Sequence, residues 1–204
     1  MIQNLLFDLG GVIIDLDRNR CVEAFTRLGL KDANSFFGEY SQQGAFAKLE
    51  AGQITVDQFH NELRKLLPDG ATDAEIDYAF EQFLLDIPEH RLIALQELRQ
   101  KYGVYLLSNT NPIHWNSIIS RQFTKMGLEL DGYFDGVVTS FEAKCCKPSA
   151  EIFQYTIDQF KIKPEETLFL DDSLKNLHAS EPFGFHTLHV TEDFTKLLPK
   201  QFIK

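Results

Sequence analysis

Several residues that can do chemistry stand at the ends of short apolar segments of this chain. Asp8 ends the first such segment, Ser108 ends the second, and the pair Asp171-Asp172 ends a later one. Lys147 lies in the loop that follows a further apolar segment. In a parallel sheet all carboxyl ends lie at one edge, where ligands bind in open α/β folds. If these segments are parallel strands, one crevice receives three carboxylates, a hydroxyl and an ammonium group.

This set of side chains suits phosphoryl transfer through an aspartate. A carboxylate such as Asp8 can attack phosphorus and form an acyl phosphate, which divides a difficult hydrolysis into two easier steps. Asp8 and Asp171 can share a Mg²⁺ ion, which prefers carboxylate, water and phosphate oxygens. Lys147 would supply positive charge to the transferring group, and the Ser108 hydroxyl with nearby backbone N–H groups would bind phosphoryl oxygens.

The second half of the chain has the pattern that would position these residues. From Pro88 onward, short apolar strands alternate with helices, which is typical of a doubly wound, Rossmann-like parallel sheet. The segment 5–8 would be its first strand. For the Asp8 stretch, a turn between two successive strands remains the alternative, because two glycines and a second apolar run follow. The expected later strands are 104–107, 136–139, 167–170 and 186–190, and the expected helices include 88–102, 112–127 and 149–160.

The segment 16–87 contains no convincing strand and reads as four or five short helices. Asp17 can begin a helix that runs through Arg27. Thr55 and Thr72 each precede a Gln or Glu at the spacing of a capping box, and helical apolar spacing follows both. We therefore expect an α/β core formed by 1–15 and 88–204, with a small all-helical cap domain, 16–87, inserted after the first strand.

Composition limits the classes of function. The 204 residues carry a net charge of −10, which argues against a nucleic-acid or anionic-membrane surface. A local cation can still hold an anionic substrate in a cleft. No apolar run approaches the length of a membrane span, and an odd count of cysteines, three, suits a reducing cytoplasm. The expected partner is a small phosphorylated metabolite, and the expected state is a cytoplasmic monomer or weak dimer.

The motifs resemble those of the haloacid dehalogenase superfamily, in the family's order and over the whole chain. The first motif is similar to Phe7-Asp8-Leu9-Gly10-Gly11-Val12, and the second to Leu106-Leu107-Ser108-Asn109-Thr110. The third is similar to Lys147-Pro148, and the fourth to Phe169-Leu170-Asp171-Asp172 followed by Asn176. The position of the helical segment resembles that of a type-one cap. Within the superfamily, the chain is most similar to phosphatases of the α-D-glucose-1-phosphate type.

The resemblance implies a role for each motif residue. Asp8 would be the nucleophile and a metal ligand, Gly10 would give its backbone carbonyl to the metal, and Asp171 would be a further ligand. Asp172 would be the second acid of the metal loop, and Asn176 would help to order that loop.

For the phosphate group, the resemblance implies three further residues. Ser108 and Asn109 of the second motif would bind it, and Lys147 would stabilise its charge. The implied cofactor is Mg²⁺, and the implied activity is hydrolysis of sugar phosphates such as glucose 1-phosphate through an aspartyl-phosphate on Asp8.

One position departs from the superfamily's usual pattern. Most of its phosphatases carry a general acid two residues after the nucleophile, where this chain has Gly10. A positioned acid typically contributes on the order of 10²–10⁴ in rate. The first hypothesis is a phosphatase of substrates with an activated leaving group, such as an anomeric oxygen. A 2-haloacid dehalogenase comes second, although it would leave Asp171-Asp172 without a purpose. A catalytically weak binding or regulatory protein comes third.

Other residues near these motifs have plainer interpretations. Asp17 is expected to cap a helix, whereas Asp15 stays open as an alternative acid. Lys144 is expected to be a solvated loop charge. Phe46 is the candidate for an aromatic residue that faces the substrate. Glu50 can bind sugar hydroxyls, but a charge on the helix surface is the favoured interpretation.

Overall fold

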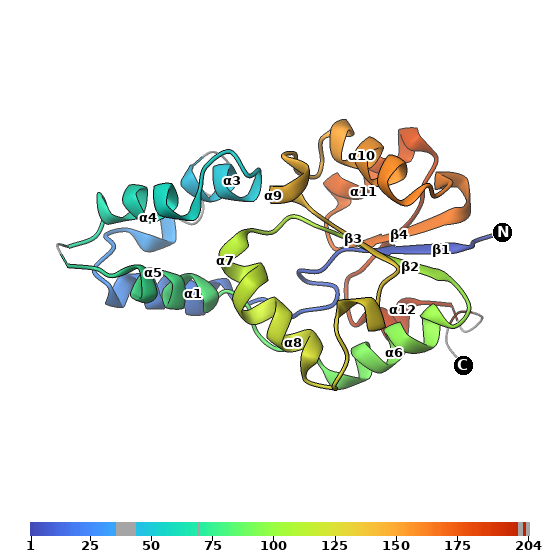
Figure 1. Ribbon diagram of the computed structural model, residues 1–204, viewed down its shortest axis with the longest axis horizontal. Coiled ribbons are helices and arrows are strands. Elements are labelled where there is room, and N and C mark those ends of the chain that lie inside the picture. The colour runs from blue at the N-terminus through green and yellow to red at the C-terminus, as the bar shows by residue number, and fades with distance from the viewer. Residues whose placement is uncertain (36–43, 69, 200–201, 203–204) are drawn as a thin grey trace.

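The computed structural model describes residues 1–35, 44–68, 70–199 and 202 of the chain. The molecule is elongated, with an α/β core at one end and a group of helices at the other (Figure 1). Residues 16–87, which we call the helical insert, leave the core after its first strand and return to it before the helix that precedes the second strand. None of the described helices is long and apolar enough to cross a membrane.

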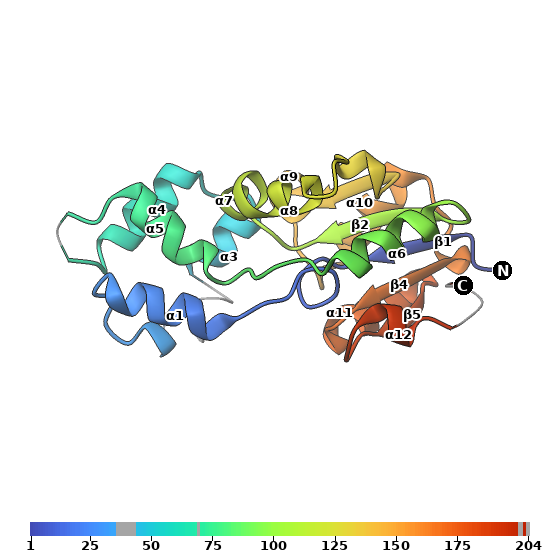
Figure 2. The ribbon, with the colours of Figure 1, turned by 90° about the horizontal axis from the view of Figure 1, so that it is seen from below.

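The core contains a five-stranded sheet in the order β3-β2-β1-β4-β5, and every pair of neighbours is parallel. This confirms the expected α/β class. The central strand β1 pairs with β2 and β4, so Phe7 lies opposite Leu106 on one side and Leu170 on the other. The carboxyl ends of all strands therefore face the helical insert (Figures 1 and 2). The strands are β1 (Asn4–Phe7), β2 (Gly103–Ser108), β3 (Gly136–Thr139), β4 (Thr167–Asp171) and β5 (His186–His189).

Helices cover both faces of the sheet, which explains why the strands are nearly continuous apolar runs. Figure 1 shows α9, α10 and α11 on one face and α6, α8 and α12 on the other. Each face has its own buried cluster: one includes Phe7 and Phe194, whose rings are 5.1 Å apart, and the other includes Phe153 and Phe169. The bounds are α6 (Glu89–Arg99), α8 (Ser120–Thr124), α9 (Ser140–Ala143), α10 (Ala150–Phe160), α11 (Leu174–Ser180) and α12 (Phe194–Leu197).

The helical insert has a third apolar cluster, to which the core contributes Ile113. Its helices begin as the sequence predicts. Asp17 accepts bonds from the N–H groups of the first turn of α1, and complete capping boxes at Thr55 and Thr72 begin α4 and α5. The described helices are α1 (Arg18–Arg27), α3 (Ala45–Glu50), α4 (Val56–Arg64) and α5 (Asp73–Glu81). The exact division at 15/16 and 87/88 stays a prediction.

The two segments that join core and insert run side by side. Leu16 and Leu84 form an isolated antiparallel bridge, the N–H of Leu85 donates to the carbonyl of Asp15, and that of Asp17 donates to the carbonyl of Phe83. The insert is thus attached by a two-segment hydrogen-bonded ribbon rather than by two independent linkers. Such a connection lets the insert be placed reproducibly over the sheet edge.

The alternative of two successive strands around Asp8 is excluded, because residues 11–13 form a turn and an isolated bridge joins Gly10 to Ile14. Two local expectations differ from the structure. The expected helix 112–127 consists of α7 (Pro112–His114), a π-type turn (Trp115–Ile119) and α8. The loop expected after β3 begins with α9. Single turns of 3₁₀ helix occupy Leu130–Gly132, Pro164–Glu166 and Glu181–Phe183.

Candidate active site

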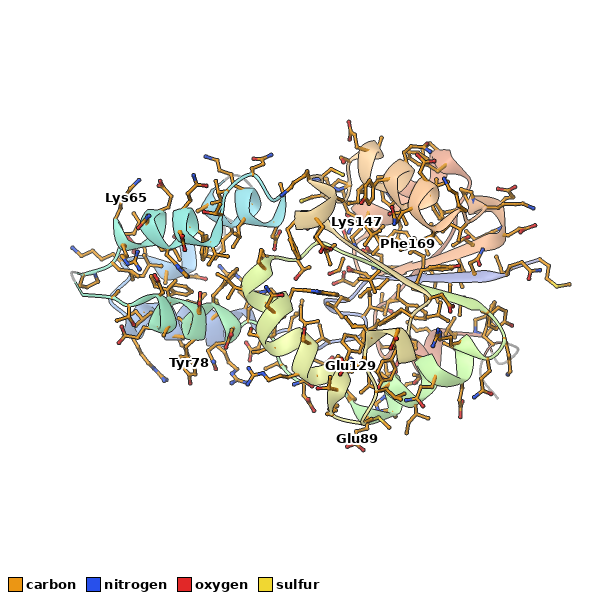
Figure 3. The ribbon with its side chains drawn as sticks, in the orientation of Figure 1. Lys65, Tyr78, Glu89, Glu129, Lys147 and Phe169 are labelled. Atoms are coloured by element: carbon orange, nitrogen blue, oxygen red, sulfur yellow. The ribbon has the colours of Figure 1, made fainter. Side chains whose placement is uncertain are left out.

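Lys147 lies between two carboxylates at the carboxyl ends of β1 and β4. Its Nζ is 2.8 Å from an oxygen of Asp8 and 2.8 Å from an oxygen of Asp171, and it donates to the carbonyl of Leu107 at 3.0 Å. All three charged side chains are almost completely withdrawn from solvent. In Figure 3 Lys147 is labelled at the sheet edge close to Phe169, whose ring centroid is 5.6 Å from the ammonium. The expected meeting of strand ends is therefore present.

The Asp171 carboxylate is held by neighbours in its own loop. One oxygen accepts from the N–H of Ser173 at 2.8 Å, and the Asn176 amide donates to both oxygens at 3.0 and 3.1 Å. Each hydrogen bond replaces one to water that burial removes, and together they fix the orientation of the carboxylate. Asn176 is thus where the resemblance placed it, beside the acid of the fourth motif.

The positive charge of Lys147 only partly compensates the negative charge and burial around Asp8. Burial raises the pKa of the Asp8 carboxyl, the negative charge of Asp171 raises it further, and the Lys147 ammonium opposes both. For Lys147, burial disfavours the charged form, but Asp8 and Asp171 outweigh this and raise its pKa. Two carboxylates and one ammonium leave an excess negative charge, which an additional cation would neutralise.

The acids also have the spacing of a metal site. One oxygen each from Asp8, Asp171 and Asp172 lie within 4.8 Å of one another. Asp172 is exposed and directed over Gly11, where a Cβ would come within 2.5 Å of its carboxylate. Oxygen ligands, partial exposure and room for water fit Mg²⁺, which usually keeps several of its waters.

The two residues expected to bind phosphate differ in their surroundings. Ser108 is buried at the end of β2, and within the described part of the chain its hydroxyl makes a single hydrogen bond, of 3.4 Å, to the carbonyl of Asn109. The amide of Asn109 instead bonds the backbone of Lys147 at both ends: its Nδ2 donates to the carbonyl, and its Oδ1 accepts from the N–H. The Asn109 side chain therefore positions Lys147, and a phosphate contact from this residue would use its backbone.

A cavity of about 470 Å³ lies between the sheet edge and the helical insert. Gly10, Ser108 and Asn109 form its floor, while Phe46 of the insert contributes to its wall, as expected. Further aromatic and aliphatic walls come from both parts of the chain. Among the described lining residues, Arg18 and Glu50 carry the charged side chains, and the apolar ones are Leu9, Ile14, Leu16, Phe46, Phe80, Phe83, Leu84 and Ile119.

His114 also lines the cavity, but it is not a proton carrier. Its ring bonds the carbonyl of Phe80 at 3.1 Å and the amide of Asn111 at 3.2 Å, and the Phe80 ring is 4.1 Å away. Burial lowers the pKa of His114 to about 4. The imidazole is therefore neutral near pH 7 and serves to join core and insert.

The structure settles the other candidate charges. Asp15 pairs with Arg91 at 2.7 Å, and the same guanidinium donates to the carbonyl of Ile13, so Asp15 has a structural role. Lys144 is exposed and follows α9, as expected of a loop charge, and its Nζ also donates to the carbonyl of Gly52 in the insert at 3.1 Å. Glu50 departs from the favoured interpretation, since it faces the cavity rather than the surface.

Sequence reasoning missed some residues that shape the site. The N–H of Thr110 donates to the Ser140 hydroxyl at 3.0 Å, which ties the second motif to α9. Arg18 reaches the cavity from the start of α1 and donates to Asn34. Neither has a local signal: each depends on which distant element lies beside it. Gly11 differs, because the two successive glycines after Asp8 are visible in the sequence and indicate a close backbone approach or a turn at this position.

Comparisons with known proteins agree with this geometry. The family model for haloacid dehalogenase-like hydrolases matches residues 2–184. The chain is 39% identical over 187 residues to the D-ribitol-5-phosphate phosphatase of Bacteroides thetaiotaomicron, covering 92% of this chain and 91% of that protein. It is 29% identical to a sesquiterpene phosphatase of Aspergillus oryzae, covering 92% and 89%.

Solved structures of the same fold include a phosphate-bound and magnesium-bound enzyme of this family. A haloacid dehalogenase family enzyme from Bacteroides thetaiotaomicron, in complex with magnesium and inorganic phosphate, superposes with a TM-score of 0.90 at 38% identity. That match covers 98% of this chain and all of the other. An L-2-haloacid dehalogenase from Xanthobacter autotrophicus has a TM-score of 0.64 at 18% identity, covering 93% and 78%, and shares the fold alone.

Proposed function

The chain belongs to the haloacid dehalogenase-like hydrolase family, as a Mg²⁺-dependent phosphatase, and we propose that its substrate is the phosphomonoester of a small sugar alcohol or sugar. The observation that carries the proposal is the Asp8–Lys147–Asp171 arrangement at the sheet edge, beside a cavity lined by the neighbouring residues Leu9, Gly10 and Ser108. The substrate class is supported by the 39% identity to a D-ribitol-5-phosphate phosphatase over most of both chains.

Asp8 would be the nucleophile. An oxygen of its carboxylate attacks phosphorus, the bond from phosphorus to the leaving oxygen breaks, and an aspartyl-phosphate forms. One oxygen of the nucleophile is already held in place, because the N–H of Leu9 donates to Asp8 Oδ1 at 2.6 Å and Lys147 contacts the same oxygen. These contacts fix the carboxylate, so that the second oxygen is the one directed to phosphorus.

Lys147 and Ser108 would hold the transferring group. The ammonium of Lys147 lies where negative charge would increase during the transfer. The Ser108 hydroxyl at the end of β2 has, among the residues that the structure describes, only the long 3.4 Å contact to Asn109, so it can donate to a phosphoryl oxygen. Asn109 keeps the backbone of Lys147 in place from the neighbouring strand end. These donors are fixed before the substrate arrives, which lowers the cost of reorganisation.

The metal would be held by Asp8, Asp171 and the backbone carbonyl of Gly10, with Asp172 as a further ligand or as a partner of bound water. When bound, Mg²⁺ supplies the positive charge that lets a phosphate dianion approach a carboxylate. Asn176 would keep the Asp171 oxygens directed at the ion.

The helical insert would serve as a cap. Its α3 contributes Phe46 and Glu50 to the cavity, and its α5 contributes Phe80, so a substrate bound at Ser108 is covered by insert residues. A covered site excludes bulk water, which strengthens every electrostatic contact inside it. Arg18 and Glu50 are the described charged groups available to hydroxyls of the carbon chain.

A second substrate class has an observation in its favour. Most of the cavity wall is aromatic or aliphatic, as in Phe46, Phe83 and Leu16, which suits an apolar alcohol better than a polyol. The sesquiterpene phosphatase relative acts, by its name, on such a compound. Glucose 1-phosphate, which Gly10 suggests through the activated leaving oxygen of that substrate, remains a further prediction.

The decisive experiment is phosphate release from a panel with and without Mg²⁺. The panel contains ribitol 5-phosphate, other pentitol and hexose phosphates, glucose 1-phosphate and farnesyl monophosphate. We expect the highest kcat/KM for a linear sugar-alcohol phosphate and no activity after EDTA treatment or in Asp8→Asn. Preference for farnesyl monophosphate would establish the second class. Chloride release from 2-chloropropionate without Mg²⁺ would instead identify a dehalogenase, and binding without turnover across the panel would identify a non-catalytic protein.

A further inference from the structure

Three positions near the nucleophile strand end that could have supplied a proton to the leaving oxygen do not do so. Gly10 has no side chain, Asp15 pairs with Arg91, and His114 is neutral and hydrogen-bonded on both nitrogens. An alkoxide is a poor leaving group, so hydrolysis of an alkyl phosphate needs a proton donor within reach of that oxygen. The donor must lie on the side of the cavity opposite Asp8, where the alcohol leaves.

Glu50 belongs to the helical insert, which faces the carboxyl ends of the strands (Figure 1). It is the last residue of α3 and lines the same cavity as Gly10, Ser108 and Asn109. Among the described residues, no hydrogen-bond donor and no cation pairs with its carboxyl group. A half-buried carboxyl directed into a substrate cavity without a protein partner is available for a ligand.

The structure also fixes where Glu50 lies. The helix α3 contacts α9, and Lys144 from the end of α9 donates to the carbonyl of Gly52, two residues after Glu50. Gly52 has a φ of +58°, and a Cβ there would collide with the carbonyl of Phe141. The turn that follows Glu50 is therefore packed directly on the core, close to the third motif.

The surroundings favour the protonated form of Glu50. Burial raises the pKa of its carboxyl to about 7. The nearby thiol of Cys146 has a pKa raised to about 11, by burial first and by the negative charge of Glu50 second. Glu50 thus lies near the residue that precedes Lys147, and near neutral pH a substantial fraction of it carries a proton.

We propose that Glu50 is the general acid of this enzyme, a catalytic residue supplied by the helical insert in place of the side chain that position 10 lacks. The inference rests on the proposed phosphatase function. As Asp8 attacks phosphorus, the electron pair of the breaking bond moves to the leaving oxygen, and the Glu50 proton moves to the same oxygen. The products are the alcohol, the aspartyl-phosphate on Asp8 and the Glu50 carboxylate.

The second half of the reaction restores the starting state. The Glu50 carboxylate accepts a proton from the water that attacks phosphorus, the bond between phosphorus and the Asp8 oxygen breaks, and inorganic phosphate leaves. Glu50 is then protonated and Asp8 ionised, as before the first step. The cycle consumes one water and needs no other reactant.

A purely binding role for Glu50, to a substrate hydroxyl, makes a different prediction from acid catalysis. A general acid matters only when the leaving group needs a proton, whereas a binding group matters for every substrate that it touches. Phenyl phosphate and p-nitrophenyl phosphate separate the two roles, because they have the same ring and no alcohol hydroxyl but differ in the basicity of the leaving oxygen. p-Nitrophenolate leaves without protonation.

The experiment compares wild type and Glu50→Gln on ribitol 5-phosphate, phenyl phosphate and p-nitrophenyl phosphate. Glu62→Gln, at an exposed glutamate of the insert, is the matched control. We expect Glu50→Gln to lower kcat/KM, which reports the steps through formation of the aspartyl-phosphate, by roughly 100-fold on the first two substrates and less than about threefold on p-nitrophenyl phosphate. Hydrolysis of the aspartyl-phosphate is common to all three substrates, so its slowing lowers kcat on each of them. The retained activity also shows that the variant is folded.

Other outcomes overturn the inference. Equal losses of kcat/KM on phenyl phosphate and p-nitrophenyl phosphate would make Glu50 a structural or positioning residue. A loss confined to ribitol 5-phosphate would make it a hydroxyl-binding residue. Unchanged rates would remove it from the reaction. If wild type with Mg²⁺ releases phosphate from none of the three, the proposed function itself fails, which is distinct from a failure of Glu50 alone.

Discussion

Gly11 and Asp172 approach so closely that a Cβ on Gly11 would lie 2.5 Å from a carboxylate oxygen of Asp172. Gly11 follows the nucleophile strand and Asp172 follows β4, so the contact joins the first and fourth motifs across the sheet edge. The φ of Gly11 is +71°, a conformation that side chains disfavour. Two independent constraints therefore require glycine at this position, and one of them concerns the metal loop.

Gly11→Ala should weaken Mg²⁺ binding as well as stability. The strain of the left-handed backbone costs about 1 kcal/mol, and the clash must also displace Asp172. Gly127→Ala is the matched control, because Gly127 has a φ of +80° but no atom near its virtual Cβ. We expect both variants to lose thermal stability, and only Gly11→Ala to need several-fold more Mg²⁺ for half-maximal activity. A similar Mg²⁺ requirement in both would show that the contact does not hold the metal loop.

Lys147→Met should nearly abolish activity and make stability strongly dependent on Mg²⁺. Removing the ammonium leaves Asp8 and Asp171 buried together without compensation, which costs about 3 kcal/mol. It also removes a charge from the transition state, for an expected loss of about 10²–10³ in kcat. Thermal melts should show a larger Mg²⁺-induced stabilisation than in wild type. The exposed Lys175→Met is the control, and an equal Mg²⁺ effect in both variants would contradict this account.

Asp193 should stabilise the protein at neutral pH but not in acid. Its carboxylate accepts from Thr195, His90 and Arg91, and these hydrogen bonds outweigh burial and lower its pKa. A lowered folded-state pKa means that the stabilisation is present above about pH 4 and is lost as the pH falls further. Asp193→Asn should therefore unfold at lower urea concentration than wild type at pH 7, and the difference should shrink below pH 4. A constant difference would exclude the ionisation as its source.

Glu50→Gln should stabilise the protein at high pH. The folded-state pKa of Glu50 is about 7, above its ordinary 4.5, so wild type loses stability as the pH rises between these values. The amide avoids this loss, and we expect the variant to gain about 1 to 3 kcal/mol at pH 8 and nothing at pH 4. Cys146, with its pKa near 11, stays neutral throughout. Urea titrations at both pH values, with Glu62→Gln alongside, provide the measurement.

The strand ends were predictable because their signals are local. An apolar run that stops at Asp8, Ser108 or Asp171 marks both a strand and a chemical group, and parallel pairing then brings the groups together. The helix starts at Asp17, Thr55 and Thr72 were equally local, since capping depends on residues within one turn.

The surroundings of individual side chains were not predictable in this way. The Asn109 amide bonds the backbone of Lys147, a partner 38 residues away that only strand order brings near. Lys144 lies in a stretch that reads as a polar loop, yet it contacts Gly52 of the insert. The direction of Glu50 depends on how α3 packs against α9, which no periodicity within six helical residues encodes.

The missing acid and its proposed replacement can be tested together in one double variant. The three atoms nearest to a Cβ at Gly10 all belong to the Leu16 side chain, the closest at 3.2 Å, and this side chain can move to admit the Cβ of an aspartate. If Glu50 supplies the proton, Glu50→Gln disables hydrolysis of alkyl phosphates, and adding Gly10→Asp places a new carboxyl beside the leaving oxygen. We expect the double variant to recover at least about tenfold in kcat on ribitol 5-phosphate over Glu50→Gln.

The control is Glu50→Gln combined with Gly10→Asn, which fills the same space without an ionisable group. It should recover nothing on ribitol 5-phosphate, and both double variants should have the same kcat/KM on p-nitrophenyl phosphate, whose leaving group needs no proton in the step that forms the aspartyl-phosphate. Recovery with asparagine would show that position 10 acts by packing against Leu16 rather than by proton transfer. Failure of aspartate alone, with p-nitrophenyl phosphate activity intact, would show that the alcohol leaves from a part of the cavity that position 10 does not reach.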